Sequence, residues 1–197
     1  GGNLNINSNL SDGFSHATAY KTGTTPADLL ADDSWSYRLV AGADNSAADP
    51  LAVKAGNKDF TLAAGKLIRT GTGDIQVASG RDIKLLDNKS VIYTAGRSAG
   101  PLSGFTQPLA NAAAFFSQGG GDIGLAAKGN IAGAPSTQLF NNWLFRQGKV
   151  NSASGTFDSS NPQTAWWIRF VQFQQGVGAL GGGDVTIAAG GDVKNLS

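Results

Sequence analysis

Two short stretches carry residue types that enzymes use for nucleophilic or metal-assisted catalysis. Gly96-Arg-Ser-Ala-Gly100 matches the nucleophile elbow, in which a serine on a strand-to-helix turn attacks a carbonyl. That chemistry needs an acid and a histidine after the serine, but the only histidine, His16, comes far before it. No helix signal follows Ser98, so the match indicates a glycine-serine loop. His16 has no second ligand at metal spacing and is interpreted as a loop residue.

Glycine-rich and acidic stretches also favour a structural interpretation. Gly119-Gly-Gly-Asp-Ile-Gly124 matches the dinucleotide fingerprint, but its glycines open a strand and its aspartate would repel a phosphate. The same corners are similar to calcium-binding nonapeptide repeats, yet they are spaced by eight residues and interrupted. Asp32-Asp33, the only adjacent carboxylate pair, is interpreted as a solvated turn. We therefore expect no catalytic, cofactor-binding or metal-binding residue.

An aromatic cluster in the second half of the chain allows two interpretations. Its members are Trp143, Phe145, Trp166, Trp167, Phe170 and Phe173. Large rings are mostly buried in proteins, which favours packing of the cluster against the rest of the fold. Exposed rings would instead form a platform for a glycan or a partner protein. The residues expected to contact such a partner are Trp35, Tyr37, Trp143, Trp166 and Trp167.

A repeated phrase predicts the elements that must position these residues. Asn or Asp is followed by an apolar residue, a second apolar residue two positions later, and two small residues. The first apolar residues of the five copies are Leu4, Phe60, Ile75, Ile123 and Val185. Alternation with a period of two is typical of a strand with one buried face. In the last three copies, Gly and then Asp or Asn introduce a second strand eight residues later, which indicates a corner.

Short strands separated by corners at a fixed spacing predict an all-β fold, a right-handed parallel β-helix in the form of a solenoid. Each coil would hold two or three strands and bury its apolar residues by stacking on its neighbours. Coils should rise by about 4.8 Å each. The side chains expected to point inward in stacked columns are Ile75, Val77, Ile83, Leu85, Ile123, Leu125, Val185 and Ile187.

Three long inserts interrupt the predicted rungs. They span about residues 11–55, 92–119 and 132–180. All 6 prolines lie in them, and proline cannot donate to a sheet ladder. Within the inserts, Thr25–Leu30 and Pro108–Phe116 predict short helices, and Thr164–Phe173 predicts a strand. The whole chain, residues 1–197, is predicted to be one β-helical segment of a longer protein.

Composition narrows the classes of function. The chain has 28 glycines among 197 residues and contains neither glutamate nor methionine, which disfavours an all-helical protein or an ordinary α/β enzyme. A net charge of +1 without charge runs disfavours nucleic acid as a partner. No apolar stretch approaches the length of a membrane-spanning helix, and the lack of cysteine excludes disulfides and thiolate metal sites.

The rung phrases resemble those of the filamentous haemagglutinin family, large exoproteins exported by two-partner secretion. The phrases that carry the resemblance are Gly182–Ser197, Gly121–Ile131 and Gly1–Ile6, together with Ser34–Asp44 and Phe173–Gly183 in the inserts. The resemblance spans nearly the whole chain, which departs from the family pattern in its long inserts. It implies a right-handed β-helical shaft on the outer surface of a Gram-negative bacterium, and it implies no catalytic residue because the shaft has none.

The expected function is that of a non-enzymatic adhesive segment, with the rungs as scaffold and the inserts as interaction surface. The alternatives are a polysaccharide-cleaving or glycan-binding β-helix protein and the shaft of a contact-dependent toxin carrier. Expected partners are the outer-membrane secretion partner and a glycan or protein on a host or neighbouring cell. Because neither end shows a cap, we also expect further rungs at both ends, from the same polypeptide or from stacked copies.

Overall fold

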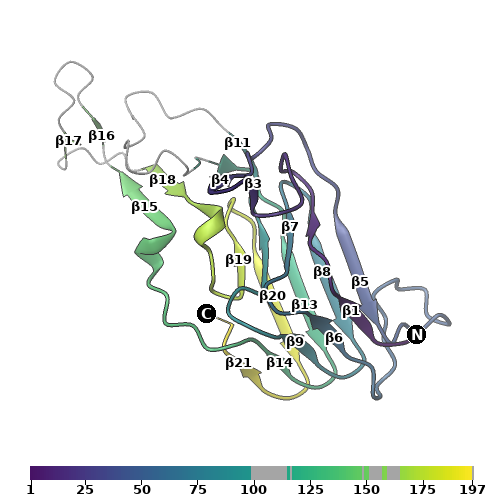
Figure 1. Ribbon diagram of the computed structural model, residues 1–197. Coiled ribbons are helices and arrows are strands. Elements are labelled where there is room, and N and C mark those ends of the chain that lie inside the picture. The colour runs from purple at the N-terminus through teal and green to yellow at the C-terminus, as the bar shows by residue number, and fades with distance from the viewer. Residues whose placement is uncertain (99–114, 116, 148, 151–156, 159–164, 197) are drawn as a thin grey trace.

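The computed structural model describes all residues except 99–114, 116, 148, 151–156, 159–164 and 197 (Figure 1). Strands are the main regular elements of the described part of the chain, and its only helical elements are two 3-10 turns, η2 (Phe140–Asn142) and η3 (Phe170–Gln172). None of the helices described there is long and apolar enough to cross a membrane. The glycine-rich composition without glutamate accounts for this scarcity of helix.

Three parallel sheets hold most of the strands, and we number them in the order in which the chain visits them. Sheet 1 consists of β1 (Leu4–Ile6), β6 (Phe60–Leu62), β9 (Ile83–Leu85), β14 (Ile131–Ala132) and β21 (Val193–Lys194). Sheet 2 consists of β2 (Leu10–Ser11), β7 (Leu67–Thr70), β10 (Val91–Thr94) and β19 (Val177–Ala179). Sheet 3 consists of β5 (Tyr37–Ala41), β8 (Ile75–Ser79), β13 (Ile123–Ala127) and β20 (Val185–Ala189). We call each circuit from sheet 1 through sheet 2 to sheet 3 a pass.

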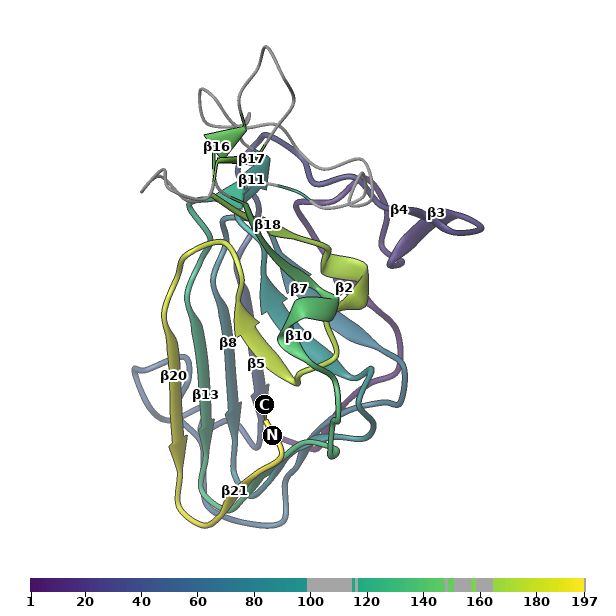
Figure 2. The same cartoon turned by 90° about the vertical axis from the view of Figure 1, so that its left-hand side faces the viewer.

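The strands of sheet 3 run parallel side by side (Figure 2), and each pairs with its neighbour over five residues. Ile123 of β13 lies between Ile75 of β8 and Val185 of β20. Two residues further along, Leu125 occupies the same position between its neighbours on β8 and β20. The step of eight residues from Ile75 to Ile83 carries the chain from sheet 3 to sheet 1. The predicted columns of apolar residues are therefore confirmed in register.

The inner faces of the three sheets share one apolar core, but the columns are not buried along their whole length. Ile75 and Ile123 are at most 1% exposed. Val185 is 42% and Ile187 is 39% exposed, because β20 is the edge strand of sheet 3 and no further strand covers them. Val185 and Ile187 therefore continue the predicted columns in register without being buried like their neighbours.

Sheet 2 differs from the other two because both of its faces are covered. All four residues of β7 and all four of β10 are buried. Ile68 and Ile92 face the central core, whereas Leu67 and Val91 belong to a second apolar cluster formed with the inserts. Burial of both faces explains why neither strand shows the apolar-polar alternation of a strand with one buried face.

The predicted helix at Thr25–Leu30 is wrong. Thr25–Pro26 forms β4, which pairs antiparallel with β3 (Tyr20–Thr22). Ala27 and Leu29 are then buried while the residues between and after them are exposed, which is the alternation of an extended chain. Burial of these two side chains against sheet 2 outweighs the helix-start signal of Thr25 and Pro26.

The remaining insert predictions have mixed outcomes. Pro108–Phe116 lies outside the described residues except for Phe115, which forms an antiparallel bridge with Ile168. Thr164–Phe173 contains the predicted strand only as β18 (Ala165–Ile168), which pairs antiparallel with β15 (Leu144–Gln147) before η3 begins. The other short pairs are β11 (Arg97–Ser98) with β12 (Ser117–Gln118) and β16 (Lys149–Val150) with β17 (Phe157–Asp158).

The predicted insert boundaries included residues that belong to the parallel sheets. Residues 37–41 form β5, residues 92–94 lie in β10, and residues 177–179 form β19. Within one pass, the repeated phrase occurs twice. Phe60 begins a strand of sheet 1, and Ile75 begins a strand of sheet 3. Both kinds of strand follow a corner that needs Asn or Asp, so the sequence alone does not separate them.

Candidate functional site

The residues that match catalytic motifs do not gather into one site. Ser98 lies in β11, and its backbone N–H donates to the carbonyl of Leu30 at 2.9 Å. His16 is exposed, with the hydroxyl of Ser15 at 3.1 Å from its Nδ1 atom. Asp33 is exposed and lies 3.3 Å from the Arg97 guanidinium. Within the described residues, no three histidine or aspartate side chains are placed so that they could hold a metal ion.

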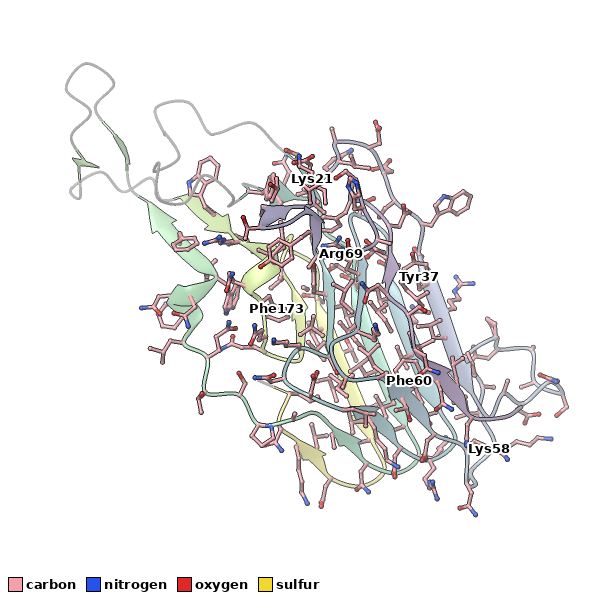
Figure 3. The ribbon with its side chains drawn as sticks, in the orientation of Figure 1. Lys21, Tyr37, Lys58, Phe60, Arg69 and Phe173 are labelled. Carbon is pink, nitrogen blue, oxygen red and sulfur yellow. The ribbon has the colours of Figure 1, made fainter. Side chains whose placement is uncertain are left out.

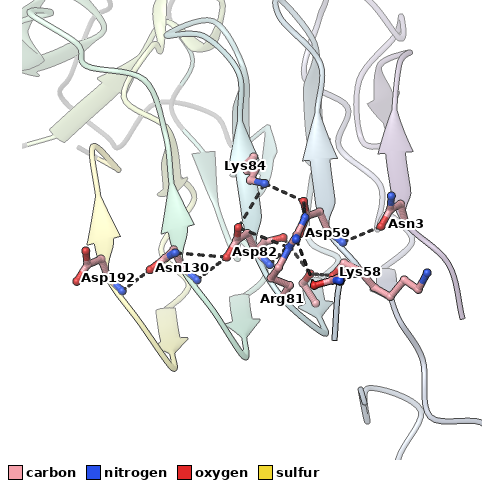
Figure 4. A network of polar contacts seen from close by, with 10 residues as sticks. Asn3, Lys58, Asp59, Arg81, Asp82, Lys84, Asn130 and Asp192 are labelled. Atoms are coloured by element: carbon pink, nitrogen blue, oxygen red, sulfur yellow. Dashed lines mark hydrogen bonds and ion pairs between the residues drawn. The ribbon is translucent and has the colours of Figure 1, made fainter. Parts of the chain in front are cut away.

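The Asn and Asp residues of the repeat form a hydrogen-bonded ladder at the corner between sheets 3 and 1 (Figure 4). Each side-chain oxygen accepts a hydrogen bond from the backbone N–H of the equivalent residue one pass later. In chain order the members are Asn3, Asp59, Asp82, Asn130 and Asp192, joined at 3.0, 3.2, 2.9 and 2.8 Å. The ladder satisfies corner N–H groups that the sheets leave without a partner.

A second ladder of the same kind lies at the corner between sheets 2 and 3. Its members are Ser36, Asp74, Asp122 and Asp184, joined at 2.9, 2.9 and 2.8 Å. Asp74 and Asp122, which follow the corner glycines, therefore accept hydrogen bonds from backbone N–H groups. These hydrogen bonds give Asp122 a structural role at its corner.

Asp59 is the centre of the densest charged network in the described chain (Figure 4). Its carboxylate accepts hydrogen bonds from Arg81 Nε and Nη2, both at 2.6 Å, and from Lys84 Nζ at 2.7 Å. The bonds from Arg81, followed by those from Lys84 and the backbone N–H of Asp82, hold the pKa of Asp59 far below its usual value. The network joins β6 to β9 across the outside of sheet 1, and every member has a structural partner.

Arg69 is the largest fully buried side chain on the outer face of sheet 2 (Figure 3). Its guanidinium donates to the Tyr93 hydroxyl at 3.0 Å and to the carbonyls of His16 and Thr18 at 2.8 and 2.9 Å. The Phe14 ring lies against it, with the guanidinium carbon 3.7 Å from the ring centroid. Arg69 thus fastens the first insert to the sheet.

Trp143, Phe170 and Phe173 of the aromatic cluster pack on the same face of sheet 2. Trp143, Trp167, Phe170 and Phe173 are at most 9% exposed. Phe170 stacks on Tyr93 at 5.9 Å between ring centroids, Phe173 meets Tyr93 edge-on at 5.8 Å, and Trp143 meets Phe173 edge-on at 5.1 Å. Burial is therefore confirmed for these four members.

The other two members of the cluster differ from these four. Phe145 is half-buried, and the side chain of Trp166 lies outside the described part of the chain. Three tryptophans in this insert were expected to contact a partner. Two of them, Trp143 and Trp167, are buried, so their rings are not accessible to a partner.

Trp35 and Tyr37, the two other residues expected to contact a partner, lie at the start of sheet 3. The Trp35 side chain is 83% exposed, whereas its backbone N–H donates to Asp12 Oδ2 at 2.6 Å. On either side, Ser34 and Ser36 bond to the turn between β7 and β8. Tyr37 is half-buried, and burial, with a smaller effect of the Asp12 carboxylate, raises its pKa. Trp35 is an exposed ring on a fixed backbone.

A groove of about 560 Å³ lies on the outer face of sheet 3. The loop that contains Asp49 and Leu51 lines it on one side, and small residues of β8, β13 and β20 line it on the other. Among the latter, Ala78, Ala126 and Ala188 lie side by side in register. The volume falls within the range of small-ligand sites.

Sequence reasoning missed Arg69, Tyr93 and the partners of Asp59. One signal was available for Arg69, because it is a charged residue directly after the apolar pair Leu67 and Ile68 of β7. Comparison of this chain with protein-family models, curated proteins and solved structures finds no match.

Proposed function

We propose that this chain is a non-enzymatic structural and adhesive segment of a secreted bacterial cell-surface exoprotein. In this proposal the three sheets are the sides of a right-handed parallel β-helix, which acts as a scaffold. The supporting observation is that successive passes pair parallel and in register in all three sheets, with a ladder at two corners. Stacking of such passes would build a rigid shaft, and this role requires no catalytic or binding residue in the sheets.

The inserts would provide the surface that contacts a glycan or protein on a host or neighbouring cell. Among the candidate contact residues, the exposed ring of Trp35 supports this role best, with Tyr37 beside it. Trp143 would act by fixing the insert to sheet 2, and Trp167 is buried as well. The full-length protein would be exported through an outer-membrane secretion partner and would remain on the outer surface of a Gram-negative bacterium.

A binding assay tests this function directly. Purified chain is added to cultured cells and to immobilised glycans, and bound protein is measured for the wild type, Trp35→Ala and Leu139→Ala. Leu139 is a matched control because it is also exposed, at 65%, but lies in the third insert. We expect Trp35→Ala to weaken binding about tenfold, the size of effect typical of an aromatic anchor, and Leu139→Ala to leave it unchanged. Cleavage of any polysaccharide by the purified chain would overturn the non-enzymatic proposal.

The groove on sheet 3 favours one alternative, a glycan-binding or polysaccharide-cleaving β-helix protein. Ala126→Arg would fill the groove, because Ala126 lies on its floor and is exposed. Loss of glycan binding in Ala126→Arg, with normal binding in Trp35→Ala, would assign recognition to the groove. The remaining alternative, the shaft of a contact-dependent toxin carrier, is decided by the sequence of the downstream polypeptide.

A further inference from the structure

One corner position distinguishes the first pass from the three later ones. The residue immediately before the ladder between sheets 2 and 3 is Trp35 in the first pass and Gly73, Gly121 and Gly183 in the later passes. These three glycines do not have positive φ angles. Backbone conformation therefore does not explain why they are glycine.

Space explains it. A Cβ atom at Gly73 would lie 2.1 Å from the carbonyl oxygen of Trp35, which is the equivalent residue of the preceding pass. A Cβ atom at Gly121 would lie 2.3 Å from the Gly73 oxygen, and one at Gly183 would lie 2.2 Å from the Gly121 oxygen. All three distances are far below van der Waals contact. Every pass that stacks on a preceding one through this corner must therefore carry glycine here.

Trp35 breaks this rule on the β5 edge of sheet 3. A parallel strand placed on β5 in the same register would bring its corner carbonyl onto the Cβ atom of Trp35. The Trp35 backbone is held by the hydrogen bond to Asp12, and Ser34 is bonded to Thr72 and Gly73, so the residue is not free to turn aside. The exposed indole occupies additional space beside the same edge.

The opposite edge of sheet 3 has the complementary features. Val185 and Ile187 of β20 continue columns that are buried elsewhere, yet they are 42% and 39% exposed. Asp184, the last member of its ladder, accepts no hydrogen bond from any of the described residues. Asp184 is the equivalent of Asp122 one pass later, and Asp122 Oδ1 accepts a hydrogen bond from the Asp184 N–H at 2.8 Å. The Asp184 carboxylate is thus placed to accept the same bond from a further strand.

We propose that sheet 3 takes a further parallel strand only at β20, and that Trp35 closes the β5 edge to such a strand. The strand that fits at β20 has glycine at the corner, then a residue whose N–H bonds to Asp184, then alternating apolar residues. Residues 121–127 of this chain have that sequence. The inference rests on the proposed β-helical function and specifies which edge would continue the β-helix.

A peptide with the sequence of residues 120–128 provides the probe, and the amide signals of the 197-residue protein are followed by NMR during titration. We expect the peptide to shift the β20 amides and to slow their hydrogen exchange by about threefold or more, with no effect on β5. A control peptide carrying Gly121→Ala should do neither, because its extra Cβ would meet the Gly183 carbonyl. The proposal is overturned if the β20 amides do not respond or respond equally to both peptides.

Two variants of the protein test the role of Trp35. Trp35→Gly removes the Cβ atom and should make the β5 amides respond to the same peptide. Trp35→Ala removes the indole but keeps the Cβ atom, so its β5 edge should stay closed. Equal behaviour of the two variants, or a response of β5 in the wild type, would refute the role of Trp35. The adhesion assay is independent, since loss of cell binding in Trp35→Ala would leave the peptide result at β20 unchanged.

Discussion

Sheets 1 and 3 contrast with sheet 2 in how the same chain stabilises them. In sheets 1 and 3, each strand follows an Asn, Asp or Ser, and the ladders at their corners repeat from pass to pass. Sheet 2 has no such repeated phrase, and its outer face is covered by inserts that occur once. The first type of stabilisation is periodic and local, whereas the second depends on contacts between residues far apart in sequence.

The contrast also distinguishes the outer faces of the three sheets. Alternation leaves the outer faces of sheets 1 and 3 polar or small, so substitutions there are expected to be tolerated where the side chain has no hydrogen-bonded or charged partner. On sheet 2, Arg69 and Tyr93 bind two different inserts to one face. The exposed parts of the inserts therefore share an aromatic base that is fixed on sheet 2.

The largest expected effect tests the periodic core. Ile123→Asp should prevent folding, because an unpaired charge would be placed in a column that is 1% exposed. Val185→Asp introduces the same charge in the same column, but at an edge position that is 42% exposed, so it should cost only about 1 kcal/mol. The yield of folded protein and the free energy of unfolding in urea, measured for both variants, distinguish the two substitutions. Equal damage from both substitutions would show that β20 is covered in solution.

The sequence was sufficient to predict the periodic half of this comparison. Apolar alternation and the Asx corners specify the columns at Ile75 and Ile123, because each depends on residues within eight positions. Edge exposure at Val185 was not predictable from residue type, since that residue matches its buried neighbours. The contacts of Arg69 were missed because they join residues separated by about 50 positions in sequence, and no local pattern records them.

The next largest effect tests the insert face of sheet 2. Phe170→Ala should lower the free energy of unfolding by about 3–5 kcal/mol, because Phe170 is 3% exposed and packs against Phe14, Tyr93 and Phe115. Phe140→Ala is the matched control, since Phe140 is 62% exposed, and it should change stability by less than about 0.5 kcal/mol. Hydrogen exchange in the Phe170→Ala variant should accelerate more in η3 than in β13. Equal acceleration in both would mean that the insert and the central core unfold together.

A smaller effect is expected at the charged network of sheet 1. Asp59→Asn should cost about 1–2 kcal/mol at neutral pH, because the ionised carboxylate loses its charge-assisted bonds while its partners Arg81 and Lys84 stay accessible to water. The folded-state pKa of Asp59 is lowered, so this stabilisation is present above the unfolded pKa of about 4 and is lost as pH falls below it.

Urea unfolding at pH 7 and at pH 3 measures this pH dependence. The difference between wild type and Asp59→Asn should shrink at the lower pH. Thr61→Ala on the same outer face of β6 is the control and should show no pH-dependent difference. A constant difference at both pH values would mean that the network contributes through packing and not through charge.

The smallest effect separates an interior ladder position from a terminal one. Asp122→Ala should cost about 0.5–1 kcal/mol, because the N–H of Asp184 loses its acceptor at 2.8 Å and must be satisfied by water. Asp184→Ala removes the same side chain one pass later, where no described residue donates to it, and should be neutral within about 0.5 kcal/mol. Thermal unfolding of both variants under the same conditions gives the comparison. If Asp184→Ala were the more damaging substitution, its carboxylate would already have a partner in solution, and the β20 edge could not be the open one.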